Sequence, residues 1–209
     1  MQLPFKINTV EKTSEALLKE KGSEFFSYSY PIKTEVEAND LLNSLRKKFY
    51  DATHHCYAFK LSDGTIKYSD DGEPGGTAGI RILNAINHFD LNNIIVIAVR
   101  YFGGTKLGVG PLGKAYYESA LECLKQSKII SQFQKQNMSV KFPFEQSNFV
   151  HKILIRYSVK ILRTDYTDSP RITCTVKIES SDKLITELTA NPSIGIKVNF
   201  VDESTFYEI

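Results

Sequence analysis

The pattern of apolar and polar residues predicts that the chain begins with a hairpin followed by a helix. Apolar residues flank Lys21-Gly22, a dipeptide that favours a tight turn, and an aromatic-rich return strand ends at Pro31. Residues 34–50 then repeat apolar side chains at helical spacing, and Thr34 is suited to cap the first turn. The apolar stripe of this predicted helix consists of Val36, Leu41, Leu42, Leu45 and Phe49.

Further strands and helices are predicted between residues 53 and 128. Residues 53–61 are strand-like and precede the turn signal Asp63-Gly64, and helical spacing of apolar residues resumes from Ala78. Residues 92–102 form a continuous apolar run, which is typical of a strand buried on both faces. Another helix is predicted from Lys114 to Lys128.

The pattern restarts after a polar, glutamine-rich stretch and gives the order βαββαβ. Strands are predicted over 138–144, 159–167, 171–179 and 195–201, and helices over 145–158 and 180–191. Ser180 or Ser181 is expected to cap the second helix, and Asp168-Ser169-Pro170 separates two strands. This order is that of a ferredoxin-like unit. We therefore predict an α+β protein with two domains, residues 1–134 and residues 135–209.

Composition restricts the class of protein without naming a partner. The 209 residues are 42% hydrophobic and 24% charged, with a formal net charge of +2, as in ordinary folded soluble proteins. This total leaves room for a local basic patch. The three cysteines form no CxxC pair, which indicates a reducing compartment rather than disulfides or structural zinc. Because neither a signal peptide nor a membrane span is recognisable, we expect a cytoplasmic protein.

The stretch YSDDGEPGGTAG, residues 68–79, contains more acid and glycine than an ordinary turn requires. It holds the carboxylates Asp70, Asp71 and Glu73. Carboxylates are ligands for a cation such as Mg²⁺, although the spacing of an EF-hand is absent. They can also pair with Arg81, Arg100 or Lys106 and tie two loops together, or present charge to a basic protein partner.

A second glycine-rich stretch, GGTKLGVGPLG at residues 103–113, precedes a predicted helix. It contains G-x-G-x-x-G, but the strand ends too early for a dinucleotide turn and no acidic ribose partner follows. Lys114 is followed by Ala115, so a Walker A loop is absent as well. Both stretches open helices, so a small anion bound by backbone N–H groups, with Arg100 and Lys106 nearby, stays open. The alternative is that the glycines serve tight turns and close packing.

His54 and Cys56 share one face of a predicted strand, and His55 lies on the other. A metal site would need further ligands, a Cys–His nucleophile remains a weaker alternative, and buried strand residues are the plainer interpretation. Aromatic residues such as Tyr101 and Phe102 are able to stack bases, although strand aromatics more often belong to a core. We recognise no catalytic set in the sequence and assign no catalytic residue.

Five motifs occur in a fixed order between about Gly22 and Tyr117: GSEFF, DATHHCYAF, YSDDGEPGGTAG, ILNAI and VRYFGGTKLGVGPLGKAY. Together they resemble the IMPACT family in its bacterial YigZ-like branch. The segment from about Met138 is similar to the small C-terminal domain of those bacterial proteins. The resemblance implies an N-terminal domain like the second domain of ribosomal protein S5. It also implies a ferredoxin-like C-terminal domain like the last domain of elongation factor G.

The resemblance implies a function as well. Eukaryotic members regulate translation during amino-acid starvation, and bacterial members are associated with translation or nucleic acid. We therefore expect a translation-associated regulatory protein of the stress response, more a binding protein than an enzyme, that contacts a ribosome, an RNA or a translation-related protein. The alternative is an enzyme or sensor that binds a phosphate or nucleotide at the glycine-rich stretches. No cofactor, metal or membrane is expected.

The family pattern falls on both glycine-rich stretches, with departures at three positions. Glu24 stands where relatives often have a basic residue, Pro111 replaces a glycine, and Gly113 replaces an aliphatic residue. The first two weaken the case for tight phosphate binding, although a proline is acceptable at a helix start. The residues expected to form the functional loops are Asp70, Asp71, Glu73, Gly75, Gly76, Thr77, Gly79, Arg100, Tyr101, Phe102, Gly103, Gly104, Lys106, Gly108 and Lys114.

Overall fold

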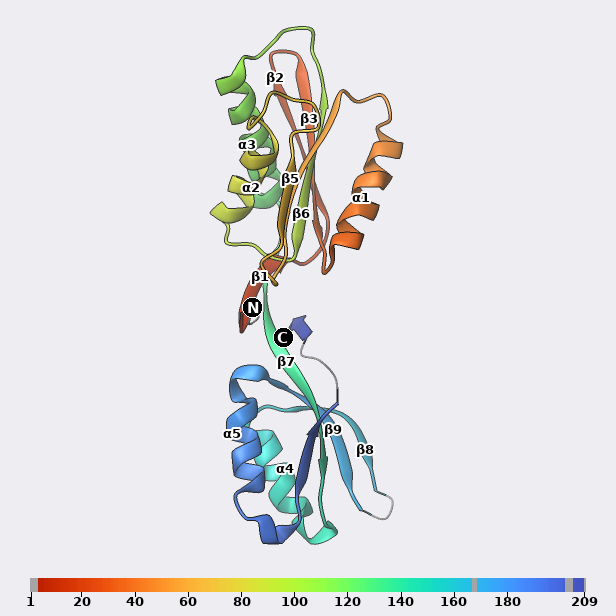
Figure 1. Cartoon of the computed structure of the whole chain (residues 1–209), viewed down its shortest axis with the longest axis vertical. Coiled ribbons are helices and arrows are strands. Elements are labelled where there is room, and N and C mark those ends of the chain that lie inside the picture. Colours follow the sequence, from red (N-terminus) through yellow and green to blue (C-terminus); the bar gives the residue numbers. More distant parts are fainter. Residues whose placement is uncertain (1–3, 167–168, 202–204, 209) are drawn as a thin grey trace. The chain divides into compact units, whose positions relative to one another are not determined.

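The computed structural model describes the backbone of residues 4–166, 169–201 and 205–208, with side chains up to residue 201 (Figure 1). The chain divides into two compact units. We call Ile7–Ser131 the N-terminal unit, and Pro4–Lys6 together with the chain from Gln132 onward the C-terminal unit. In the described part of the chain, no helix is both long enough and apolar enough to cross a membrane.

An antiparallel sheet forms the centre of the N-terminal unit, with the strand order β2-β3-β6-β4-β5. Its strands are β2 (Ser14–Glu20), β3 (Ser23–Pro31), β4 (His54–Lys60), β5 (Ile66–Ser69) and β6 (Ile94–Tyr101). The predicted hairpin is confirmed: Lys21 and Gly22 both have positive φ angles, 45° and 80°, as a tight hairpin turn requires. The central strand β6 is buried from Ile94 to Arg100, which confirms the strand covered on both faces.

Three helices cover the two faces of this sheet, with α1 (Glu35–Lys48) on one face and α2 (Gly79–His88) and α3 (Val109–Lys125) on the other (Figure 1). The Thr34 side chain caps α1 by accepting the N–H of Glu37 at 3.2 Å. Of the predicted stripe, Leu42 and Leu45 are buried, whereas Val36 is 68% exposed because it lies in the first turn, away from the sheet.

The helix predicted from Lys114 begins five residues earlier, at Val109. Its first helical hydrogen bond runs from the N–H of Leu112 to the carbonyl of Gly108, at 2.9 Å. Pro111 fits there because the first turn of a helix does not need the N–H that proline lacks. The G-x-G-x-x-G pattern therefore lies mostly inside a helix and does not form a free loop.

The C-terminal unit has the predicted order βαββαβ. Its elements are β7 (Ile129–Lys141), α4 (Ser147–Arg156), β8 (Lys160–Asp165), β9 (Arg171–Lys177), α5 (Ile178–Thr189) and β10 (Lys197–Phe200), with short 3₁₀ turns at Phe144–Gln146 and Pro192–Ile194. The strand order β10-β7-β9-β8 is ferredoxin-like, and β1 (Lys6–Val10) and β11 (Thr205–Glu208) also pair with β7. The α+β fold class is thus confirmed.

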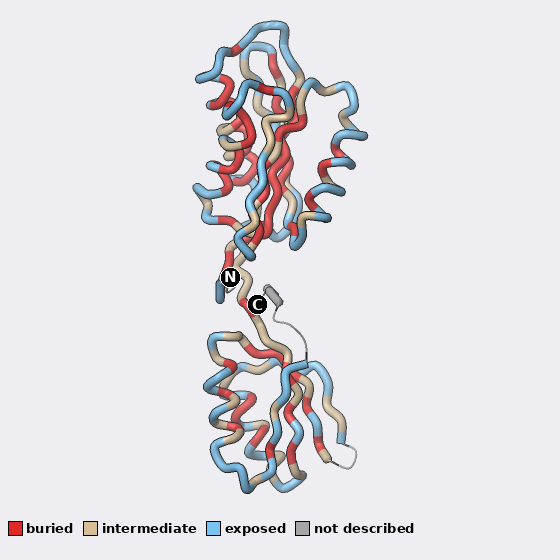
Figure 2. The backbone as a smooth tube through the Cα atoms, in the orientation of Figure 1, coloured by how far each residue is buried: buried red, intermediate tan, exposed pale blue. Residues whose placement is uncertain are grey.

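The helices α4 and α5 cover one face of the C-terminal sheet. Buried residues of β7 and β9, such as Met138 and Cys174, pack there against Val150, Leu154 and Leu184 of the two helices. Figure 2 shows buried residues concentrated along the central strands and on the sides of the helices that face them.

Two local features of this half of the chain differ in detail from the sequence-based description. The glutamine-rich stretch belongs to β7, which begins at Ile129, so the predicted domain boundary after residue 134 falls inside a strand. Helix α5 begins at Ile178, and neither Ser180 nor Ser181 caps it, because Ser181 instead donates its hydroxyl to the Ile178 carbonyl at 2.9 Å. Of the predicted turn at Asp168-Ser169-Pro170, Asp168 lies outside the described residues.

Candidate functional site

The connections that carry the sequence motifs leave the same end of the N-terminal sheet. Strands β2, β5 and β6 all run in one direction, because each pairs antiparallel with a strand of the opposite direction. The turn after β2, the acidic stretch after β5 and the second glycine-rich stretch after β6 therefore gather at one edge (Figure 1). We call the turn at residues 21–22 together with residues 70–81 and 102–114, which include the starts of α2 and α3, the loop end.

Asp70 is engaged by the start of helix α2. Its carboxylate accepts the backbone N–H groups of Gly76, Ala78 and Gly79 at 2.8 to 2.9 Å. Partial burial opposes ionisation of Asp70, but these three hydrogen bonds outweigh it and hold the pKa of the carboxyl below its usual value. The N-terminus of α2 thus already holds an anion that the chain itself supplies, so the small anion left open for the first stretch has no free donors among these three groups.

Asp71 joins the acidic stretch to β4 and α1. One of its carboxylate oxygens accepts the N–H of His55 at 2.7 Å, and the other accepts Arg46 Nη2 at 2.9 Å. The Asp71 carbonyl oxygen lies 2.7 Å from Nδ1 of His54. Asp71 therefore helps to position the stretch, and the sequence alone did not identify Arg46 as its partner because the two residues belong to distant elements.

Glu73 lies at the centre of a buried polar network. Its Oε1 accepts hydrogen bonds from Arg100 Nη1 and from the Tyr116 hydroxyl, both at 2.6 Å. Arg100 also donates from Nη2 to the Ser23 hydroxyl at 3.2 Å. Glu73 and Arg100 are only 8% and 5% exposed. Of the partners considered for the acidic stretch, Arg100 is the one that Glu73 contacts, and this pair fastens the stretch to the end of β6.

His54 and Cys56 share one face of β4, as predicted, and both contact the acidic stretch. The Cys56 thiol is fully buried and donates to the Asp70 carbonyl at 3.0 Å and to the Tyr116 hydroxyl at 3.3 Å. Burial raises the pKa of this thiol well above its usual value. Because a nucleophilic cysteine must be accessible and ionised, Cys56 is a structural residue.

Burial also lowers the pKa of His55, against the opposing effect of Asp71, so the neutral imidazole is favoured on the α1 face of the sheet. Nε2 of His54 lies 3.7 Å from Oε2 of Glu73. Within residues 4–166 and 169–201, no three His, Cys, Asp or Glu side chains gather as a metal site would require. The carboxylates of the acidic stretch instead turn toward different partners.

The glycines of the loop end divide into two classes. A Cβ atom on Gly103 would lie 1.9 Å from the carbonyl carbon of Gly22, and one on Gly79 would lie 2.7 Å from the N atom of Ser69. These two glycines are therefore needed for close packing between backbones. By contrast, nothing lies within 4 Å of the corresponding position on Gly75, Gly76 or Gly104.

The remaining residues of the predicted loops also separate into inward and outward groups. Thr77 is buried and donates its hydroxyl to the Pro74 carbonyl at 2.6 Å, and the Tyr101 hydroxyl donates to Asp51 at 2.8 Å. The outward group comprises Gly75, Gly76, Phe102, Gly103, Gly104, Lys106, Gly108 and Lys114. Sequence reasoning missed Ser23 and Tyr116, although both lie within the motifs GSEFF and GKAY, because polar partners far apart in the chain carry no local signal.

Side chains of both charges surround the start of α3. Lys21, Gly110 and Lys114 line a pocket of about 320 Å³, to which Glu20 and Glu118 also contribute. Gly108, with a φ of 86°, precedes the helix and provides no side-chain cap. Arg81 of α2 donates from Nε to the Gly76 carbonyl at 3.2 Å. The same side chain lies beside Gly113, where an added Cβ atom would be 3.2 Å from Arg81 Nε.

Comparison with known proteins assigns the family. The Impact N-terminal domain family matches residues 21–124. An IMPACT family member of Thermus thermophilus is 36% identical over 63% of this chain and 72% of its own length. The chain belongs to the IMPACT family. YvyE of Bacillus subtilis is 35% identical over 58% of this chain, and YigZ of Escherichia coli is 31% identical over 62% of it. These matches span 57% and 65% of the two relatives' lengths.

A solved structure of a hypothetical protein has the same fold. It covers 96% of this chain and 100% of its own length, with a TM-score of 0.68 and 23% sequence identity. The two-unit α+β architecture is therefore found in an experimental structure. The IMPACT motifs at residues 70–79 and 100–108 coincide with the loop end described above.

Proposed function

We propose that this IMPACT family protein is a non-enzymatic binding protein of translation, and that its loop end contacts RNA on a ribosomal particle. Family membership supports the assignment to translation, because the eukaryotic members that its motifs resemble act there. RNA is the partner whose phosphates fit the groups that the loop end exposes. The protein is expected to act in the cytoplasm, where ribosomes are found.

The observation that carries this proposal is the division of charge at the loop end. The three carboxylates of residues 70–73 and the guanidinium of Arg100 are engaged with groups of the unit itself. The basic residues Arg81, Lys106 and Lys114 are exposed there, beside open glycine backbone. Lys114 forms an ion pair with Glu118 at 3.5 Å, but this pair is exposed and within one helix, so it contributes little and leaves the amine accessible. The start of α3 adds the positive end of a helix dipole. Lysine, arginine and backbone N–H groups at helix starts are the usual contacts of proteins with phosphates.

Co-sedimentation of the full chain with ribosomal particles tests this proposal. We expect binding at low salt that weakens steeply as salt is raised, because phosphate contacts release counterions. Replacing Lys106→Gln together with Lys114→Gln is expected to weaken binding about tenfold, because two phosphate contacts are lost. The salt slope is expected to fall by about 2, since each lost phosphate contact removes about one unit. The matched control is Lys33→Gln with Lys47→Gln, which removes the same charge from exposed positions in and before α1. Equal binding by the two variants would show that the loop end is not the contact surface.

The second candidate function is a sensor or enzyme that binds a phosphate or nucleotide. Only the start of α3 still favours it, because Asp70 engages the start of α2. A thermal-shift experiment with ATP, GTP and inorganic phosphate, each with Mg²⁺, distinguishes the two functions. A rise in Tm with a nucleotide that Lys106→Gln abolishes would favour the sensor, whereas no shift with any of these ligands would exclude it.

A further inference from the structure

The sheet of the C-terminal unit has a polar face on the side opposite its two helices. Residues paired across neighbouring strands share a face, so the strand register identifies the members of this surface. From Lys135 to Lys141 on β7, and along all of β9, the residues that alternate with the buried core positions are polar or charged. We call this surface the open sheet face; it consists of Lys135, Asn137, Ser139, Lys141, Lys160, Arg163, Asp165, Arg171, Thr173, Thr175, Lys177, Lys197 and Asn199.

Charge is segregated between the two sides of this unit. The open sheet face carries seven basic residues and one acidic residue, Asp165. The other carboxylates that the structure describes between residues 132 and 201 lie on the helical segments, at Glu145, Glu179, Asp182 and Glu187. The near-neutral total charge of the chain therefore conceals a surface of strongly positive potential.

The cations of the open sheet face form rows across the strands. Lys197, Lys141 and Arg171 are direct cross-strand neighbours on β10, β7 and β9, and neighbouring strands are about 4.8 Å apart. Like charges placed directly opposite one another destabilise a sheet. Four basic residues of this face are exposed and form no ion pair among the residues the structure describes: Lys141, Lys160, Arg163 and Lys197. Arg171 is exposed as well, but Asp165 is its cross-strand neighbour on β8. Rows of unpaired like charge are stabilised by a bound polyanion.

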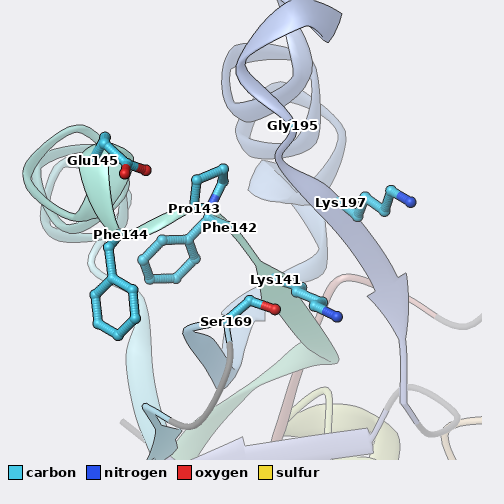
Figure 3. A pocket seen from close by; sticks show the side chains of 8 residues that line it. All are labelled: Lys141, Phe142, Pro143, Phe144, Glu145, Ser169, Gly195 and Lys197. Atoms are coloured by element: carbon cyan, nitrogen blue, oxygen red, sulfur yellow. The ribbon is translucent and has the colours of Figure 1, made fainter.

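The lysines at the end of this row also border a pocket of about 460 Å³. Figure 3 shows Lys141 and Lys197 extending from neighbouring strands, while the Glu145 carboxylate lies beyond Phe142 and Pro143 in this view. Among the described residues that line the pocket, Glu145 is the one carboxylate, and it forms no ion pair with the two amines, which stay available to a ligand on the sheet.

We propose that the open sheet face binds the phosphate backbone of a nucleic acid. Lysine and arginine supply the charge, and the hydroxyl and amide groups of Ser139, Thr173 and Asn199 between them are suited to donate hydrogen bonds to phosphate and sugar oxygens. The only aromatic ring that β7 brings to this side of the sheet, Phe133, lies 4.2 Å from the Lys177 amine. Base stacking is therefore minor, and binding is insensitive to sequence.

This inference takes RNA as its first probe because it rests on the proposed function, although the surface is separate from the loop end. Fluorescence anisotropy with a labelled RNA duplex of about 20 base pairs, longer than the roughly 16 base pairs that a double-stranded RNA-binding domain spans, measures affinity as a function of salt. The variant Lys141→Gln with Lys197→Gln removes two charges from the face. The control Lys152→Gln with Lys183→Gln removes two charges from exposed positions of α4 and α5 in the same unit.

The face variant is expected to bind the duplex about tenfold more weakly than the control, with a salt slope lower by about 2. Equal affinities of the two variants would overturn the inference, as would preferential binding of phosphatidylserine vesicles or of polyglutamate over the duplex. Repeating the measurement with a DNA duplex of the same sequence shows whether the face binds DNA as well as RNA, and either result is consistent with the inference. Loss of binding in the Lys106→Gln, Lys114→Gln variant alone would leave the proposed function standing and reject the open sheet face. Loss of binding in the face variant alone would support the open sheet face and reject the loop end as the RNA contact. A wild-type chain that binds no RNA would reject both the proposed function and the open sheet face.

Discussion

The loop end of the N-terminal unit and the open sheet face of the C-terminal unit hold their charges in opposite ways. At the loop end, acids and bases are buried together, as in the 2.6 Å pair of Glu73 and Arg100. On the open sheet face, the exposed cations Lys141 and Lys197 are neighbours and form no ion pair with a described carboxylate. The difference teaches that a motif rich in charged residues can serve the fold, whereas an unremarkable strand can present charge to a partner.

The largest expected effect would break the loop-end network. Glu73→Gln removes the charge that compensates Arg100 in a site where the two side chains are 4% and 6% exposed. Removing one partner of a buried ion pair typically costs about 3 to 5 kcal/mol, because the other charge stays buried without compensation. Urea denaturation of the full chain measures this loss, and Glu15→Gln, an exposed carboxylate of the same unit, is the control. A cost below about 1 kcal/mol, the range of exposed pairs, would contradict the structural role given to Glu73.

The next effect tests whether the glycines of the loop end serve packing. Gly103→Ala would drive a methyl group into the backbone of Gly22 and is expected to cost about 3 kcal/mol, at the upper end for overpacking. Gly110→Ala, in the first turn of α3 with nothing within 4 Å, is the matched change and is expected to be neutral or stabilising by up to about 1 kcal/mol. Similar unfolding midpoints for the two variants would show that the second stretch is not held against the β2–β3 turn.

A smaller effect, dependent on pH, is expected at Asp70. Replacing Asp70→Asn weakens three hydrogen bonds to the start of α2 and should cost about 1 to 2 kcal/mol at neutral pH. Because the folded-state pKa of Asp70 is depressed, its contribution is fully present above the unfolded pKa and is lost as pH falls through the folded value. The stability difference between wild type and variant should therefore shrink as pH falls below about 4, the pKa of an unfolded aspartate. A difference that stays constant with pH would show that ionised Asp70 is not the cap.

The smallest expected effect on stability concerns the open sheet face. Lys141→Gln with Lys197→Gln should change the free energy of unfolding of the isolated chain by no more than about 0.5 kcal/mol, because exposed side chains without partners contribute little. A slight stabilisation is consistent with relief of like-charge repulsion. A loss above about 1 kcal/mol would mean that these lysines hold the fold together, and the loop end and the open sheet face would then no longer differ.

Much of the architecture was predictable because its signals are local. The Lys21-Gly22 turn, the Thr34 cap and the buried strand β6 each depend on a few consecutive residues, and all three are confirmed. The misplaced starts of α3 and α5 share another cause. Each helix begins within a segment that the sequence pattern assigned to a loop or a strand, since packing against the sheet extends a helix beyond its apolar stripe.

The candidate sites were less predictable because their partners are remote. Fifteen loop residues were expected to form one functional surface, yet several of them face inward, Glu73 and Thr77 among them. Ser23 and Tyr116 lie within the family motifs, but nothing near either residue in the sequence identified its partners in the network. The open sheet face was not anticipated at all, because its basic residues are scattered over four strands.

By itself, the sequence determined which segments are strands and helices, how the C-terminal unit is ordered, and to which family the chain belongs, because propensity, periodicity and motifs act over short distances. Only the tertiary structure decided which charges are neutralised within the protein and which face outward. That decision depends on strand register and on which distant elements pack together, since an ion pair forms only where folding brings its partners within a few ångströms.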